Sequence, residues 1–240
     1  MRPLILPVLL GALLSFFAPA SVLAQRVLLR ENVADDTVRS TFGPNRAFYN
    51  HAYLSYGLVA GPAGGAGAAL RYGRSAEVQL GLRNKWRISQ PLALGLDVRY
   101  ARPVYHLAQT GQKTVPNAVL HRREYLALPQ AQTEAFVRLS YGRRGNAIGR
   151  YVDALGWGGW VISSVHHYED GASNGAKKVQ TSERGLAYVN RWTYGAGARL
   201  GSGRYALVGR YRLSHVFRPG TQPRYPELPR WLLGLELSWL

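Results

Sequence analysis

Hydrophobic and polar residues alternate along most of the chain after residue 48. The pattern is clearest at residues 230–240, where every second side chain is apolar and a tryptophan stands at each end: Trp231, Leu233, Leu235, Leu237 and Trp239. The other positions include the charged Arg230 and Glu236. Because successive side chains of a β-strand point to opposite faces, this period of two predicts a two-faced strand.

The same alternation predicts eight strands, at residues 48–61, 75–88, 92–100, 124–141, 150–168, 186–200, 205–214 and 230–240. Their connections alternate in length. The hydrophilic segments at 62–74, 109–123, 169–184 and 218–229 are long, whereas the turns at 89–91, 143–149 and 201–203 are short. Outer-membrane barrels join their strands by short periplasmic turns and longer external loops. We therefore predict an all-β fold, an eight-stranded antiparallel up-and-down transmembrane β-barrel over residues 48–240, closed by pairing of its first and last strands.

The polar face of each strand is assigned to the lumen, because a lipid-facing surface must be apolar. The charges expected inside are Glu77, Arg83, Asp97, Arg99, Glu134, Arg138, Asp153, Arg191, Arg199, Arg210, Arg212 and Glu236. The aromatic girdle expected outside consists of Trp86, Tyr100, Trp192, Trp231 and Trp239. An eight-stranded barrel is just wide enough for side chains to fill it, and buried charges need partners. We expect a structural salt-bridge network, with a narrow ion or water path as the alternative, and Arg210 or Arg212 as partners of Glu236.

The first 24 residues have the pattern of a secretory signal peptide. Arg2 precedes an apolar run from Leu4 to Phe17, and Val22-Leu23-Ala24 supplies a cleavage site of the small-x-small type. An uncleaved membrane helix is disfavoured, because the run is shorter than the roughly 20 apolar residues that a span needs. We expect residues 25–47 to form an irregular periplasmic lead-in. The sequence contains no cysteine, which excludes disulfides, thiol catalysis and thiolate metal sites.

The chain resembles the small eight-stranded outer-membrane β-barrels, the OmpA/OmpX-like group. The features that carry this resemblance are the signal-peptide pattern, the eight two-faced strands, the alternating loop lengths and the closing segment LLGLELSWL. The likeness covers about residues 48–240. Gly234, Leu237 and Trp239 are similar to the C-terminal assembly signal of that group, although the last residue is Leu240 and not an aromatic residue. The resemblance implies a place in the cell outer membrane, insertion by the barrel-assembly machinery, and contact with outer-membrane lipid and lipopolysaccharide. A peptidoglycan-binding domain is expected to be absent.

The formal net charge is +17. A basic soluble protein is a candidate for nucleic-acid binding, but an exported chain has no such partner, so anionic lipid headgroups are the expected counter-charge. The basic residues expected in the outer loops are His121, Arg122, Arg123, Lys177, Lys178 and Arg184. The alternative is a soluble secreted ligand-binding barrel of lipocalin type, in which the inside is apolar and the outside polar.

One dense cluster of possible catalytic groups stands out, His166-His167 with Ser163, Ser164, Glu169 and Asp170. Some small barrels modify lipid A, and the deacylases among them carry a His-x-Ser-Asn motif. Here His167 is followed by Tyr168-Glu169, and Ser173-Asn174 comes six residues on, so the spacing does not match. We predict a non-enzymatic protein with a structural or surface-interaction role and no cofactor; a lipid A-modifying acyl hydrolase or transferase is the alternative. The other histidines show no metal-ligand spacing.

Overall fold

The computed structural model describes residues 42–142, 145–171, 177–220 and 225–240. The predicted signal peptide and most of the predicted lead-in lie outside these residues. The elements are β1 (Phe48–Ala60), the 3₁₀ turns η2 (Ala66–Ala68) and η3 (Tyr72–Arg74), β2 (Ala76–Arg87), β3 (Leu92–His106), β4 (Arg123–Ala127), β5 (Gln130–Tyr141), β6 (Arg150–Val161), β7 (Val165–Asp170), β8 (Val179–Arg184), β9 (Trp192–Ser202), β10 (Tyr205–Arg212) and β11 (Trp231–Ser238). None of the described helical segments is long and apolar enough to span a membrane.

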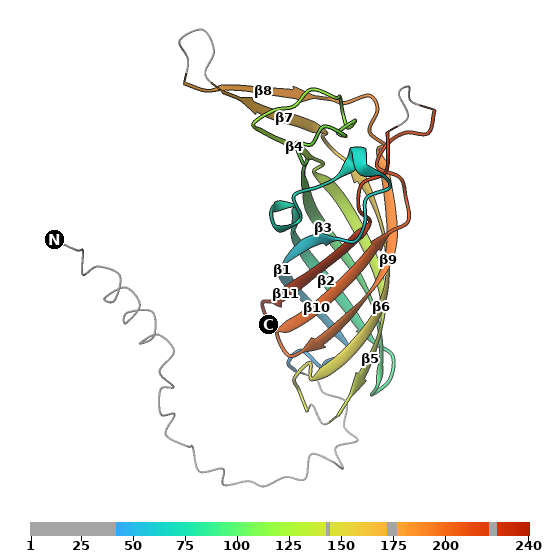
Figure 1. Cartoon of the computed structure of the whole chain (residues 1–240). Coiled ribbons are helices and arrows are strands. Elements are labelled where there is room, and N and C mark those ends of the chain that lie inside the picture. Colours follow the sequence, from blue (N-terminus) through green and yellow to red (C-terminus); the bar gives the residue numbers. More distant parts are fainter. Residues whose placement is uncertain (1–41, 143–144, 172–176, 221–224) are drawn as a thin grey trace, which may run out of the picture. The chain divides into compact units, whose positions relative to one another are not determined.

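Eight of the strands form a closed antiparallel barrel, in the order β1–β2–β3–β5–β6–β9–β10–β11 and back to β1 (Figure 1). At the closing seam, Leu54 of β1 lies opposite Leu237 of β11, and Leu58 lies opposite Leu233. The predicted eight-stranded barrel and its closure between the first and last strands are confirmed. The barrel has a short-turn end, at residues 88–91, 142, 145–149 and 203–204, and a loop end, which carries the longer connections.

The two faces of the barrel strands differ in polarity as the alternation predicted. Leucines on the outer face are widely exposed, among them Leu80 (54%), Leu207 (60%) and Leu235 (64%). Buried charged residues fill the middle of the inner face. Apolar side chains cover the interior at both ends: a cluster with Leu107, Leu126, Leu128, Phe217 and Leu228 at the loop end, and Ile148, Tyr151 and Ala206 at the short-turn end. The charged layer is therefore enclosed from both ends.

Two of the predicted strands are each broken in two. The strand expected over 124–141 divides into β4 and β5 at Leu128-Pro129, because proline has no amide hydrogen for the ladder. The strand expected over 150–168 divides into β6 and β7 opposite this break, where the Pro129 carbonyl accepts a hydrogen bond from the Ile162 amide at 2.9 Å. β7 pairs with β4 and with β8, which lies in a segment predicted to be a loop. These three strands form a side sheet that projects from the loop end (Figure 1).

Two other boundaries differ from the prediction. β9 begins at Trp192 and not at residue 186, and the segment before it folds against the loop end, where Val189 forms a bridge with Phe217. The described part of the lead-in, residues 42–47, contains no strand. It lies along the short-turn end instead, where the Asn45 amide donates to the Asn146 carbonyl at 3.1 Å and the Arg87 amide donates to the Ala47 carbonyl at 2.8 Å.

Candidate functional site: the charged interior of the barrel

Five arginines and four carboxylates meet in the middle of the barrel, all with side chains at most 3% exposed: Arg83, Arg99, Arg138, Arg199, Arg210, Asp97, Glu134, Asp153 and Glu236. Strand register produces several of these contacts directly. Arg83 lies opposite Asp97, Arg138 opposite Asp153, and Asp153 opposite Arg199. Opposite charges on facing positions of neighbouring strands attract one another, so the sequence pattern and the pairing register together assemble the network.

Arg199 is the centre of the network. Its Nη1 lies 2.7 Å from the Asp153 carboxylate, and its Nη2 donates to Glu134. Asp97 and Glu236 complete its surroundings, at 3.6 and 3.3 Å. One guanidinium on β9 thus contacts carboxylates from four other strands. A planar group with five donors is suited to such a position, where a single ammonium would leave carboxylate oxygens without partners.

The other arginines pair the remaining carboxylate oxygens. Arg83 contacts Asp97 through Nη2 at 2.7 Å and Glu236 through Nη1 at 2.5 Å. Glu134 accepts hydrogen bonds from Arg99 and Arg199 and lies 3.1 Å from Arg210. Asp97 and Glu134 face one another across β3 and β5 as like charges. These guanidinium groups offset the repulsion that two adjacent carboxylates would otherwise produce.

The predicted partners of Glu236 are wrong. Glu236 pairs with Arg83, which reaches it from β2 past the intervening β1. Arg210 bonds to Glu134 and to Gln79, and Arg212 bonds to Glu227 and to the Leu228 carbonyl in the last loop. The reason is that inward side chains in a narrow barrel extend across the lumen, so neighbours in the sheet need not be partners.

Two further predicted inward residues lie outside the network. Arg191 is exposed, since β9 begins one residue later and the alternation no longer sets its direction; its guanidinium lies 5.9 Å from the Trp160 ring. Glu77 is half-buried near the loop end and accepts a hydrogen bond from Gln79. The predicted girdle residues are all exposed on the outer face, and Trp192 contacts Trp160 edge-to-face at 4.7 Å between centroids.

Aromatic rings that the charge pattern did not emphasise separate the guanidinium groups. The Arg138 guanidinium lies 3.5 Å from the Tyr151 ring, and that of Arg83 lies 4.4 Å from Tyr53. Cation–π contact of this kind partly replaces lost hydration. Each ring lies over a glycine of the neighbouring strand: Tyr53 over Gly81, Phe136 over Gly95, Tyr151 over Gly201 and Trp157 over Gly195. Pairing of an inward aromatic residue with a glycine on the next strand was the signal available in the sequence.

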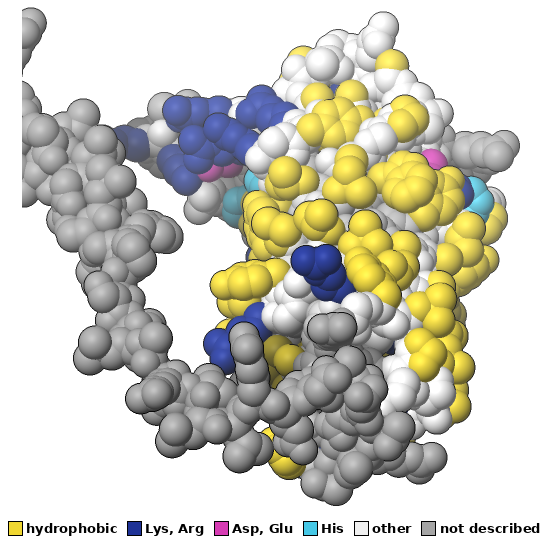
Figure 2. Space-filling model, turned by 90° about the horizontal axis from the view of Figure 1, so that it is seen from below, with side chains coloured by type: hydrophobic (Ala, Val, Ile, Leu, Met, Phe, Trp, Pro, Cys, Tyr) yellow, Lys and Arg dark blue, Asp and Glu magenta, His cyan; other side chains and the backbone are white. Residues whose placement is uncertain are grey.

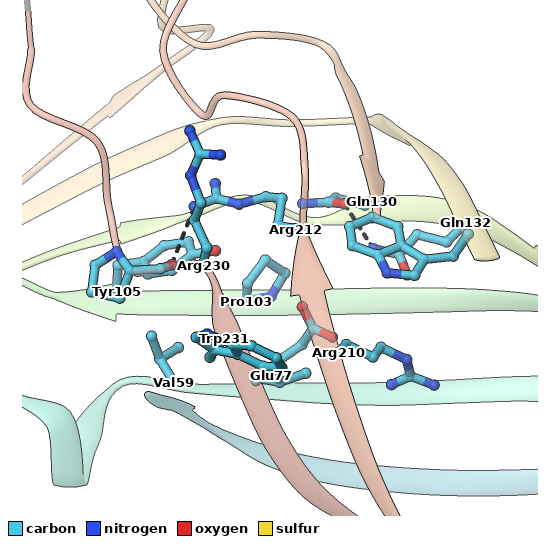
Figure 3. Close-up of a pocket in the computed structure, with 13 residues that line it drawn as sticks. Val59, Glu77, Pro103, Tyr105, Gln130, Gln132, Arg210, Arg212, Arg230 and Trp231 are labelled. Atoms are coloured by element: carbon cyan, nitrogen blue, oxygen red, sulfur yellow. Dashed lines mark hydrogen bonds between the residues drawn. The ribbon is translucent and has the colours of Figure 1, made fainter. Parts of the chain in front are cut away.

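Between the charged layer and the loop end lies a small cavity of about 40 Å³ (Figure 3). It is lined by Glu77, Gln130, Gln132, Arg210, Arg212 and Trp157, among others. One water needs roughly 10–15 Å³ on this measure, so the cavity has space for a few waters. Within the described residues, no group of three or more His, Cys, Asp or Glu side chains is arranged to hold a metal ion.

The predicted histidine cluster is divided between the two faces of the side sheet, because His166 and His167 are adjacent in β7. His166 lies between Glu124 (Nε2, 2.8 Å) and Glu183 (Nδ1, 3.1 Å). Glu124 also contacts Lys113 at 2.6 Å. On the other face, His167 Nδ1 lies 2.7 Å from the Ser182 hydroxyl and its ring stacks on Tyr125 at 4.8 Å. Lys113, Glu124 and Ser182 were not predicted as site residues.

Burial alone would lower the pKa of His166, but hydrogen bonds to Glu124 and Glu183 outweigh it and raise the pKa above 6.5. Burial would raise the pKa of Glu124, but hydrogen bonds with His166, Lys113 and Gln109 lower it below 4.5. The His166 contribution is therefore complete below pH 6.5 and lost as pH rises through the folded-state pKa. The Glu124 contribution is complete above pH 4.5 and lost as pH falls through its own.

We predict that the side sheet is most stable between about pH 4.5 and 6.5. Amide hydrogen exchange of β7 and β8, corrected for the intrinsic pH dependence of exchange, is expected to accelerate as pH rises above this window. His166→Gln should remove that acceleration, whereas His167→Gln, on the opposite face of the same strand, should retain it. Identical pH profiles for wild type and His166→Gln would contradict the assignment.

Models of known protein families gave no match to this chain, and neither did a search of curated proteins.

Proposed function

We propose that this chain is an integral outer-membrane β-barrel with a structural or surface-interaction role, whose lumen is filled by the salt-bridge network. One observation carries the proposal: the barrel is apolar outside and charged inside. Exposed Leu, Val and aromatic side chains lie on the outer face of all eight barrel strands, while nine charged residues are enclosed within. A soluble barrel with this exterior would present a large apolar surface to water, and lipocalin-type barrels have the opposite polarity.

The positions of the exposed aromatic residues agree with this role. Trp160, Trp192 and Trp231 lie towards the loop end of their strands, and Trp86 and Trp239 lie towards the short-turn end. Tryptophan is favoured where hydrocarbon meets headgroups, because its ring is apolar and its N–H is polar. We assign these residues to the two membrane interfaces, with the loop end outside the cell and the short-turn end in the periplasm, as in other barrels of this kind.

The experiment that tests this proposal is fractionation of cells that express the full chain. The protein should sediment with outer membranes, require detergent for release, and migrate faster in a gel before boiling than after, since the closed barrel resists unheated detergent. Recovery in the soluble periplasmic fraction, or a mobility that heating does not change, would refute it.

A lipid-modifying enzyme remains the second candidate, because His167 and the Ser182 hydroxyl are within hydrogen-bond distance on an accessible face. A serine hydrolase also needs a group that orients the base. Among the described side chains, Tyr125 and Ser182 are the partners of the His167 ring, and no carboxylate is paired with it to act as that group. The non-enzymatic role is therefore our proposal.

We predict that His167→Ala leaves the lipid A of producing cells unchanged. The measurement is mass spectrometry of lipid A from cells that express wild type, His167→Ala or an empty vector, with barrel assembly checked by gel mobility. A lost or gained acyl chain that depends on His167 would favour the enzyme instead.

A further inference from the structure

The side sheet has two chemically different faces, set by its register. Glu124, His166 and Glu183 share one face, where the His166 ring is within hydrogen-bond distance of both carboxylates. Arg123, Tyr125, His167, Glu169 and Arg184 share the other face, here called the basic face. Among the described residues, the basic face is the more open one: Arg123 and Arg184 are exposed and Tyr125 and His167 are partly exposed, whereas Glu169 is buried.

The basic face continues the outer surface of the barrel. β4 pairs with the end of β3, where Val104 lies opposite Ala127 and His106 lies opposite Tyr125. Val98 and Tyr100 on the same face of β3 are exposed and belong to the apolar exterior. A row of rings crosses the junction, from His106 to Tyr125 (5.3 Å) and on to His167 (4.8 Å). The basic face therefore begins where the apolar exterior of the barrel ends.

Positive charge is concentrated at this junction. The cations are Arg102 on β3, Arg71 and Arg74 in the first loop, and Arg123, Lys178 and Arg184 at the side sheet. The first loop is fixed beside β3, since the Arg71 amide donates to the His106 carbonyl at 2.8 Å. In a view from below, Lys and Arg side chains gather beside the barrel, where the side sheet projects (Figure 2).

One carboxylate lies among these six cations. Glu169 contacts Lys178 at 2.9 Å and Arg123 at 3.9 Å. Among the residues that the structure describes, no carboxylate lies within 4.0 Å of Arg71, Arg74, Arg102 or Arg184. These four arginines are exposed. The basic face, together with Arg102 on β3 and the two arginines of the first loop, thus carries an excess of guanidinium groups without carboxylate partners, next to the apolar exterior of the barrel.

We infer that the basic face binds the phosphate groups of lipopolysaccharide in the outer leaflet, next to the barrel wall. The inference rests on the proposed outer-membrane location. With the apolar exterior in the bilayer core, the basic face lies at the level of the headgroups, where cations attract anionic lipid. Guanidinium groups bind phosphate oxygens in pairs, and the ring row suits the boundary between hydrocarbon and headgroups. His121, one of the basic residues predicted for this role, belongs elsewhere: it bonds to Asp170 at 2.8 Å.

The test uses the purified full chain in nonionic detergent and measures bound lipid A by native mass spectrometry. Lipid A with two phosphates is compared with a phosphate-free derivative. Arg102→Gln/Arg184→Gln, called the basic-face variant, removes two unpaired cations, one on β3 at the junction and one on the basic face itself. The matched control is Arg150→Gln/Arg204→Gln, which removes two exposed arginines at the short-turn end.

We expect wild type and control to bind phosphorylated lipid A, and the basic-face variant, which lacks two cations, to bind it about thirtyfold more weakly, given the contribution of each cation near a charged surface. Removing the lipid phosphates should weaken wild-type binding by a similar factor. Equal affinity in the two double variants, or equal affinity for the two lipids, would overturn the inference. Equal affinities in a chain that fractionates as a heat-modifiable membrane protein would refute the inference and leave the proposed function intact. Recovery of the chain in the soluble fraction would refute both.

Discussion

Replacing Arg199 with methionine is expected to destabilise the folded barrel by about 3–5 kcal/mol. Arg199 is fully buried and contacts Glu134, Asp153 and Glu236, with Asp97 at 3.6 Å. Methionine fills part of the volume but donates no hydrogen bond. Removing one partner of a buried ionic network leaves the remaining charges buried without compensation. The cost of these unpaired charges is larger than the net stability that the intact ion pairs provide relative to well-packed apolar residues.

The measurement is urea unfolding and refolding of wild type and Arg199→Met in lipid vesicles, followed by tryptophan fluorescence. Arg204→Met is the control, because Arg204 is exposed in the turn before β10 and its change should alter stability by less than about 0.5 kcal/mol. If Arg199→Met were as stable as this control, Arg199 would not be the centre of the network.

Replacing Gly201 with alanine is expected to destabilise the barrel by about 1–3 kcal/mol, the usual cost of overpacking. A methyl group at Gly201 would lie 2.0 Å from Tyr151 Cζ, so the ring would have to move away from the Arg138 guanidinium that it contacts. In a Tyr151→Leu background, where the ring is replaced by a smaller side chain, Gly201→Ala should lower the free energy of unfolding by less than it does in wild type.

Gly156→Ala provides the matched control for this prediction. Gly156 also lies within a barrel strand, but a Cβ there would meet no atom within 4 Å. The same vesicle unfolding assay compares Gly201→Ala, Gly156→Ala, Tyr151→Leu and the Gly201→Ala/Tyr151→Leu pair. Equal effects of the two glycine substitutions would show that the ring over Gly201 is free to move, contrary to the packing described.

The barrel was predictable because it depends on a period-two pattern that one strand carries by itself. An outward Leu235 and an inward Glu236 differ in direction whatever their partners, so their facing follows from the sequence alone. Closure of β1 on β11 followed from the even number of strands and the alternating lengths of their connections. Local pattern and closed topology are linked in this fold, since an unclosed edge would leave backbone groups unpaired.

The pairings inside the barrel were not predictable in the same way. Choosing Arg83 as the partner of Glu236 requires the height of each residue along the barrel axis and the reach of each side chain across the lumen. Neither is contained in the alternation. Arg191 was misassigned because the predicted strand began at residue 186, whereas β9 begins at Trp192 and leaves Arg191 just outside it. The side sheet was missed because β8 is short and polar on both faces, so its sequence reads as a loop.

The central claim, that the outer face of the barrel lies in lipid, is tested most directly by spin-label accessibility. The sequence has no cysteine, so each introduced cysteine gives a single labelling site. Leu80→Cys and Leu235→Cys place labels on the exposed outer face of β2 and β11, and Val119→Cys places one on an exposed apolar residue of an outer loop. In vesicles, labels at 80 and 235 should collide readily with oxygen and poorly with a water-soluble nickel chelate, while the label at 119 should show the reverse. Equal nickel accessibility at 235 and 119 would place the apolar exterior in water and contradict the account.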